Sequence, residues 1–298
     1  MGRETLLIIL LLLFGGVVTQ VLVWFPLPGL HHKTQLRNAE RRAWLRLWLP
    51  LIPTFIVGAW LCGWALQEPD PVHDPVDSGI LITACLPYAM IVARAGFRAI
   101  WSLLREPVDI PICTVGFLQP RVVFSPLLAR RLDEAQLQAA WEHERAHARH
   151  RDPLRIWLAQ IATDLQWPWP SARERFTTWL EMLEYTRDEE ARVCGASGVD
   201  LASAILATLR HASPALRAQN VLHQGGVSTL IGDPRALQRR IARLLAPLPR
   251  QDDTATQTGV GSKALIAVLI STLIVAYALG VMYGEVVLHL LFAWTWSL

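Results

Sequence analysis

Four long apolar runs constrain this chain more than any other feature of its sequence. Residues 6–25 and 264–283 contain no charged side chain, residues 45–66 contain only Arg46, and residues 80–92 form a shorter uncharged run. A helix needs about 20 mostly apolar residues to cross the hydrocarbon core of a bilayer. The runs therefore predict transmembrane helices at about 5–26, 44–66 and 79–100, and a fourth helix from residue 263 onward.

The composition is that of a membrane protein. Hydrophobic residues make up 52% of the 298 residues and charged residues only 18%, so much of the apolar surface is expected to face lipid. A signal peptide is the alternative for the first run. That run is long for a signal peptide, only Arg3 precedes it as a basic residue, and no small-x-small cleavage site follows it.

The charges of the loops predict the orientation. Residues 31–46 carry five basic side chains and one acidic one, whereas residues 67–78 carry four acidic side chains and neither lysine nor arginine. Basic loops remain on the cytoplasmic side of a membrane. The chain is therefore expected to divide into three membrane helices (1–104), a cytoplasmic domain (105–262), and a fourth membrane helix with a short tail (263–298).

Within residues 105–262 the pattern predicts helices and a short hairpin. Strands are expected in 108–126, and helices at 133–151, 153–166, 171–195, 201–209 and 234–245. Asp133 and Ser171 are predicted N-caps, and Gly195 is the predicted residue after a helix C-terminus. The W-P-W-P stretch at 167–170 fits either a turn at the membrane interface or an ordinary loop with a buried tryptophan.

The stretch H-E-R-A-H at 143–147 fits H-E-x-x-H. On a helix, positions i and i+4 lie on one face, so His143 and His147 can bind one Zn²⁺. Glu144 follows the first ligand and is the candidate general base. The rival interpretation is a solvated basic helix with incidental histidines.

A catalytic zinc needs a third protein ligand. His150 lies about 10 Å beyond His143 along a helix axis, so it is not expected to reach the same ion. In one class of zinc peptidases the third ligand is a Glu on a second helix, and an Asp four residues later accepts the free N–H of a ligating histidine. Glu184 and Asp188 match this arrangement. The alternative is an ordinary charged helix face, since other glutamates lie nearby.

These stretches together resemble the zinc-metallopeptidase domain of the BlaR/MecR-type antibiotic-sensing signal transducers, with the HtpX-like membrane proteases as more distant relatives. The resemblance covers roughly residues 111–245. It rests on P-R-V-V-F-S-P at 120–126, on H-E-x-x-H followed by R-D-P, on the Trp-Pro loop, and on E-Y-x-x-D at 184–188.

The resemblance implies a mainly α membrane protein with four transmembrane helices and an inserted gluzincin-like α+β zinc-peptidase domain. It implies one Zn²⁺ per chain, held by His143, His147 and Glu184, with Glu144 as catalytic base and Asp188 behind the ligands. It also implies a bacterial inner-membrane location, with the catalytic domain in the cytoplasm. The implied substrate is a protein or peptide: a cytoplasmic repressor or the protein itself.

The sequence also departs from the family pattern. Arg145, Glu142 and Arg187 stand where uncharged or small residues are usual, and a cation near the zinc favours a second hypothesis, a non-catalytic signalling or scaffold protein that keeps the fold. No β-lactam-binding domain follows the last helix, so no antibiotic binding is expected. His211 and His223 are weak candidates for stabilising an oxyanion. No nucleic-acid partner is expected, since the net charge is only +3 and no motif for it appears.

Overall fold

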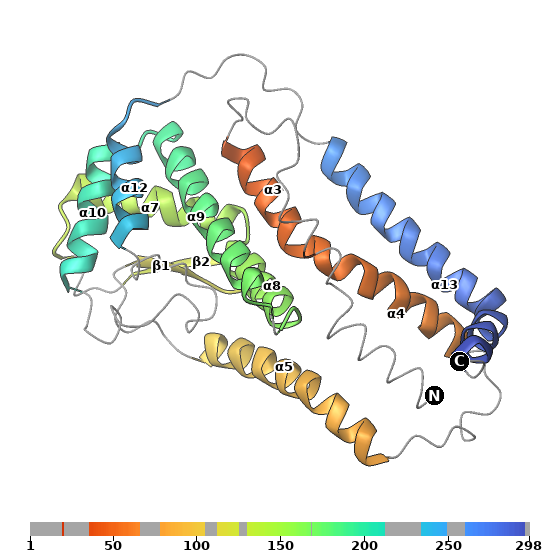
Figure 1. Cartoon of the computed structure of the whole chain (residues 1–298). Helices are drawn as coiled ribbons and strands as arrows, with labels where there is room; N and C mark the ends of the chain where they lie inside the picture. The colour runs from red at the N-terminus through yellow and green to blue at the C-terminus, as the bar shows by residue number, and fades with distance from the viewer. Residues whose placement is uncertain are drawn as a thin grey trace.

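The computed structural model is mainly helical and describes residues 20, 36–65, 78–104, 112–124, 130–167, 169–211, 234–248 and 260–295 (Figure 1). In chain order the elements are α3 (Leu36–Trp48), η1 (Leu49–Leu51), α4 (Ile52–Ala65), α5 (Ser78–Leu104), β1 (Ile112–Val115), β2 (Arg121–Phe124), α7 (Glu134–Arg149), α8 (Asp152–Asp164), α9 (Pro170–Val193), α10 (Gly198–His211), α12 (Pro234–Leu245) and α13 (Val260–Thr295). Apart from Gln20, the predicted first membrane helix lies outside the described residues.

The described helices include one or two candidate membrane spans. In α13, Ala267–Gly284 is long and apolar enough to cross a bilayer, and it coincides with the predicted fourth helix. The pair Leu36–Leu51 and Phe55–Trp64, bent by 51°, is a second candidate if it counts as one span. The predicted third helix forms α5, where Ile82, Met90 and other large apolar side chains are exposed. Four spans are not shown.

Helices α4 and α13 run side by side and approach closely (Figure 1). A Cβ atom at Gly63 would overlap the carbonyl of Tyr277, and one at Gly280 would overlap the carbonyl of Trp60. Small residues at such crossings let two helix backbones come into contact, as is common between membrane helices.

We expect Gly280→Ala to weaken the pairing of α4 and α13. The added methyl group has no space against Trp60, and overpacking of this kind costs about 1–3 kcal/mol. The measurement is the midpoint of thermal unfolding in detergent. Gly58→Ala is the matched control, because a Cβ there meets nothing within 4 Å. Equal midpoints for the two variants would contradict the prediction.

The predicted hairpin is confirmed. Strands β1 and β2 pair antiparallel, with Thr114 opposite Val122, and both pack against α7. Asp133 caps α7 by accepting a hydrogen bond from the Gln136 backbone N–H at 2.8 Å. The hairpin and the capped helix fix the position of the H-E-x-x-H stretch.

The ends of the next two helices agree with prediction only in part. Arg151, at a left-handed φ of 52°, separates α7 from α8, so Asp152 begins α8. The prediction that Ser171 caps α9 is wrong: Pro170 is the first residue of the helix, and the Ser171 hydroxyl donates to Gln20. Gly195 does follow the C-terminus of α9, with a φ of 103° that glycine adopts without strain.

Two apolar clusters hold the helices around α9. The first combines Leu47 and Leu51 from α3 and η1 with Ile156 of α8 and with Trp179 and Leu183 of α9. The second joins α7, α9, α10 and α12 through Ala139, Ala191, Leu201 and Leu244. Helix α9 therefore contributes to both clusters. Helix α3 contributes to the first of them, through Leu47.

Candidate metal centre

His143, His147 and Glu184 converge in the interior of the protein. The two histidines lie one turn apart on α7, Glu184 lies on α9, and all three are buried. One ligand atom from each lies within 4.8 Å of the other two. The described structure thus brings together the three residues that the two sequence motifs single out.

The spacing of these atoms suits a small tetrahedral ion. The two Nε2 atoms are 3.1 Å apart, and the Glu184 oxygens lie 3.5 Å from Nε2 of His143 and 3.6 Å from Nε2 of His147. Ligands at about 2.0–2.1 Å from a tetrahedral Zn²⁺ are about 3.3 Å from one another. The donor set, two imidazoles and one carboxylate, is also one that zinc prefers. The residues present therefore fit the metal.

Each imidazole has a carboxylate close to its Nδ1 atom. Asp188 Oδ1 lies 2.9 Å from Nδ1 of His143, as its spacing predicts, and Asp152 Oδ2 lies 2.9 Å from Nδ1 of His147. A carboxylate at Nδ1 favours a proton on that nitrogen and leaves Nε2 for a metal. Asp152 was not predicted as part of the site, because R-D-P was interpreted as the end of a helix and as a motif of the resemblance, with no role for its aspartate.

The unusual arginines do not add a cation among the ligands. Arg145 has a 59% exposed side chain and pairs with Glu142 at 3.7 Å. Arg187 is buried, and its guanidinium donates to both oxygens of Asp152, at 2.5 and 3.0 Å. Arg187 therefore supports the carboxylate behind His147, and Arg145 faces solvent.

A different arginine does enter the site. Arg240, on α12, donates to both oxygens of Asp188 at 2.7 and 2.8 Å, and its Nη1 lies 2.8 Å from Glu184 Oε2. Its Nη2 also lies 3.3 Å from Nε2 of His143. Sequence reasoning did not identify Arg240, because no local spacing connects it with residues some 50 positions earlier.

The buried charges shift one another's protonation. Burial by itself raises the pKa values of Glu184 and Asp188, but the Arg240 charge and then His143 outweigh it and hold both below their usual range. Burial lowers the pKa of His143, but the carboxylates of Asp188 and Glu184 outweigh burial and raise it to about 9. Without a metal, His143 is therefore a cation at neutral pH.

Zinc binding is expected to strengthen as the pH rises toward about 9 and then to level off. Below that pH the ion must displace the His143 proton, so the apparent affinity should fall about tenfold per pH unit. The His143 charge itself stabilises the metal-free fold below about pH 6.5, and this contribution is lost as the pH passes through about 9. Competition with a chelator of known affinity, at several pH values, measures the slope. A flat profile between about pH 7 and 9 would contradict the assignment.

Glu144 lies on the side of α7 that faces the hairpin. The Thr114 hydroxyl lies 2.8 Å from Glu144 Oε2 and 2.8 Å from the Glu144 carbonyl oxygen, so its single proton can be donated to either. Thr114 is buried, and burial raises the pKa of its neighbour Cys113 to about 12, helped by the Glu144 charge. The carboxylate next to the first metal ligand is thus held by a strand.

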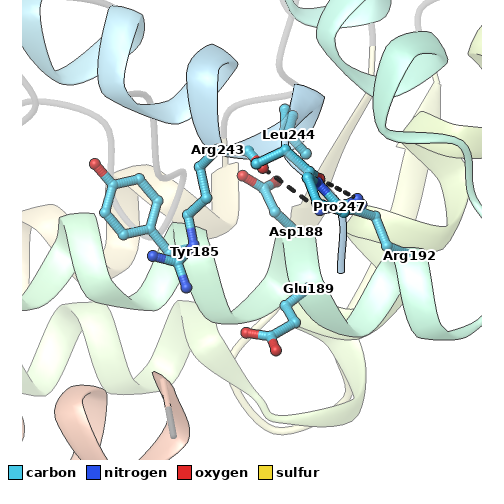
Figure 2. Close-up of a pocket in the computed structure, with 8 residues that line it drawn as sticks. Tyr185, Asp188, Glu189, Arg192, Arg243, Leu244 and Pro247 are labelled. Carbon is cyan, nitrogen blue, oxygen red and sulfur yellow. Dashed lines mark hydrogen bonds between the residues drawn. The ribbon is translucent and has the colours of Figure 1, made fainter. Parts of the chain in front are cut away.

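A hollow beside the site lies between α9 and α12. Figure 2 shows Tyr185, Asp188 and Arg192 of α9 facing Arg243 and Leu244 of α12. The Arg243 guanidinium lies 5.3 Å from the Tyr185 ring, and Arg192 donates to backbone carbonyl groups at the end of α12. Neither the metal ligands nor Glu144 line this hollow. The contacts around the hollow hold α12, the helix that carries Arg240, against α9.

The other histidines singled out in the sequence do not join the described site. His150 is exposed and lies 2.9 Å from Glu190, as expected for a residue outside the cluster. The side chain of His211 and all of His223 lie outside the described part of the chain.

Comparisons with protein-family models, with curated proteins and with solved structures found no match. The conclusion therefore rests on the site itself: a buried His-His-Glu group consistent with an H-E-x-x-H zinc centre.

Proposed function

We propose that this chain is a zinc-dependent endopeptidase anchored in a membrane. The observation that carries the proposal is the buried cluster of His143, His147 and Glu184 with Glu144 between the two histidines in sequence. Three protein ligands, two imidazoles and one carboxylate, are typical of catalytic zinc sites, whereas structural sites have four.

Under this proposal each residue of the cluster has a separate role in peptide hydrolysis. A zinc ion held at the site would supply a Lewis acid that polarises a carbonyl group and lowers the pKa of water. His143, His147 and Glu184 would hold the ion, while Asp188 and Asp152 keep the imidazoles oriented. Glu144 accepts a proton from the attacking water and delivers it to the leaving amine. Arg240 supplies a further positive charge beside the carboxylates of Glu184 and Asp188.

Thr114 is expected to orient this base. Thr114→Val removes the hydroxyl but keeps the shape of the side chain, and a hydrogen bond to a charged group contributes about 1.5–3 kcal/mol. We expect kcat on unfolded casein to fall about tenfold or more while KM and zinc content stay unchanged. Thr114→Ser should restore most of the rate. A valine variant as active as the wild type would refute this role.

The membrane arrangement belongs to the same proposal. The apolar runs support four spans, with residues 105–262 as the cytoplasmic catalytic domain and a bacterial inner membrane as the location. The motifs support membership of the BlaR/MecR-type peptidases. Under this proposal the substrate is a cytoplasmic protein, such as a repressor or the chain itself, and it reaches the site as an extended segment beside the hairpin that carries Thr114.

Arg240 favours a second candidate function, that of a signalling or scaffold protein without catalysis. Its guanidinium contacts Glu184, Asp188 and His143, so these charges have a partner even when no metal is bound. In that case the site would keep its shape without zinc.

Zinc content and proteolysis separate the two candidates. Detergent-purified protein, prepared without chelators, should contain about one zinc per chain and cleave unfolded casein. Treatment with a chelator should abolish cleavage, and added Zn²⁺ should restore it. Protein without zinc and without activity would leave the scaffold function as the better explanation.

A further inference from the structure

A line of charged contacts leads from helix α3 to the metal ligand His147. Glu40 of α3 is buried, and its Oε1 lies 2.5 Å from Nη2 of Arg155 on α8. Nη1 of the same guanidinium donates to Oδ1 of Asp152 at 3.0 Å. The other oxygen of Asp152 lies 2.9 Å from Nδ1 of His147. Three side chains thus connect α3 with an imidazole of the metal cluster.

This line is held in place by packing. The Arg155 guanidinium lies 5.2 Å from the ring of Trp44 and 5.6 Å from the ring of Trp179, which are themselves 4.9 Å apart. Asp152 is completely buried, so its position depends on Arg155, Arg187 and His147 and not on solvent. Arg155 thus lies against two tryptophan rings that contact each other, and these cation–π contacts favour its present position.

The line carries two anions, Glu40 and Asp152, and the two arginines that pair with Asp152 are Arg155 and Arg187. Arg187 also lies 3.5 Å from Glu190, which pairs more closely with Arg149, at 3.0 Å. The histidine beside them must be neutral to bind a metal. The Glu40 charge also contributes to raising the pKa of Arg187, so it acts beyond its direct partner. Removal of this anion would leave an excess positive charge beside a site for a divalent cation.

We infer that Glu40 and Arg155 are positioning residues through which α3 sets the metal affinity of the site. This inference rests on the proposed zinc function. Helix α3 continues through η1 into the apolar helix α4, which lies along the candidate span α13. A shift of α3 therefore changes the support of Asp152, and zinc binding in turn stabilises the position of α3, because coupling between two sites is reciprocal.

The test is a double-mutant cycle on zinc affinity, read by competition with a chromophoric chelator. Glu40→Gln keeps the shape of the side chain and should weaken zinc binding about tenfold, the lower end of the range for residues behind a metal ligand. In an Asp152→Asn background the same change should have no further effect. The absorption bands of bound Co²⁺ should also shift in Glu40→Gln, since they report the ligand geometry.

Two controls separate positioning from general loosening. Leu201→Ala, on α10 and in the second apolar cluster rather than the one that holds α3, should lower the unfolding temperature without changing zinc affinity. Glu174→Gln, on an exposed position of α9, should change neither. Zinc bound equally well by wild type and Glu40→Gln, or an equal loss in the Asp152→Asn background, overturns this inference alone. Wild-type protein that binds no zinc overturns the proposed function as well.

Discussion

Glu184→Ala is expected to abolish stoichiometric zinc binding. Binding of zinc by a protein site is worth about 10–16 kcal/mol in total, so the loss of one of three ligands should cost about 4 kcal/mol, or a factor of about 1000 in affinity. The substitution also leaves Arg240 with Asp188 as its remaining buried carboxylate partner at the site. Arg240 and the cationic His143 would then share one buried carboxylate, and the excess buried positive charge destabilises the fold. Metal analysis of detergent-purified protein is the measurement.

Two variants make this result interpretable. Glu184→Gln keeps the volume of the side chain and removes its charge, so it should lose zinc with less effect on stability. Glu174→Ala removes an exposed glutamate from the same helix and should keep wild-type zinc content. If Glu184→Ala retained a full equivalent of zinc, the ion would have a different third ligand.

Glu144→Gln is expected to abolish hydrolysis without loss of zinc. General acid–base catalysis by one side chain contributes about 10²–10⁴-fold, and an amide cannot accept the proton. The fold should remain intact, because the Thr114 hydroxyl can still donate to the amide oxygen or to the backbone carbonyl. Cleavage of unfolded casein and zinc content, measured on the same preparation, give the two readouts.

Glu142→Gln is the matched control for this variant. Glu142 lies two residues earlier on α7 and pairs with Arg145 and Gln138 rather than with a residue of the cluster, so its replacement should leave the rate unchanged. Full activity of Glu144→Gln would exclude Glu144 as the base. Loss of zinc together with activity would point to a structural role instead.

Local spacing predicted the two pairs of the cluster, and the pattern of zinc peptidases joined them, but neither identified Asp152. His143, His147, Glu184 and Asp188 are related by intervals of four residues, and helical geometry alone brings such pairs to one face. Asp152 lies five residues after His147 and across a break between helices, so no helical period connects it with the site. Its role follows from the left-handed turn at Arg151, which cannot be inferred from composition.

The sequence did not predict the long-range contacts of the site, for a second reason. Arg240 reaches the site only because α12 packs against α9, and the sequence does not specify that pairing. The N-cap prediction at Ser171 failed because a proline directly before it occupies the first helical position more readily. Glu40 was counted only as one acidic residue in a basic loop, whereas in the structure it is the buried partner of Arg155.

The shared core of α3 and α9 has a consequence for how this protein can evolve. Trp44 and Leu47 on α3 fill space against Trp179 and Leu180 on α9, at 0% exposure for three of these four side chains. A change of volume on one helix therefore requires a compensating change on the other. Among related sequences, these two stretches, more than 130 residues apart, are expected to covary, so that α3 is inherited with the candidate metal centre and not exchanged independently of it.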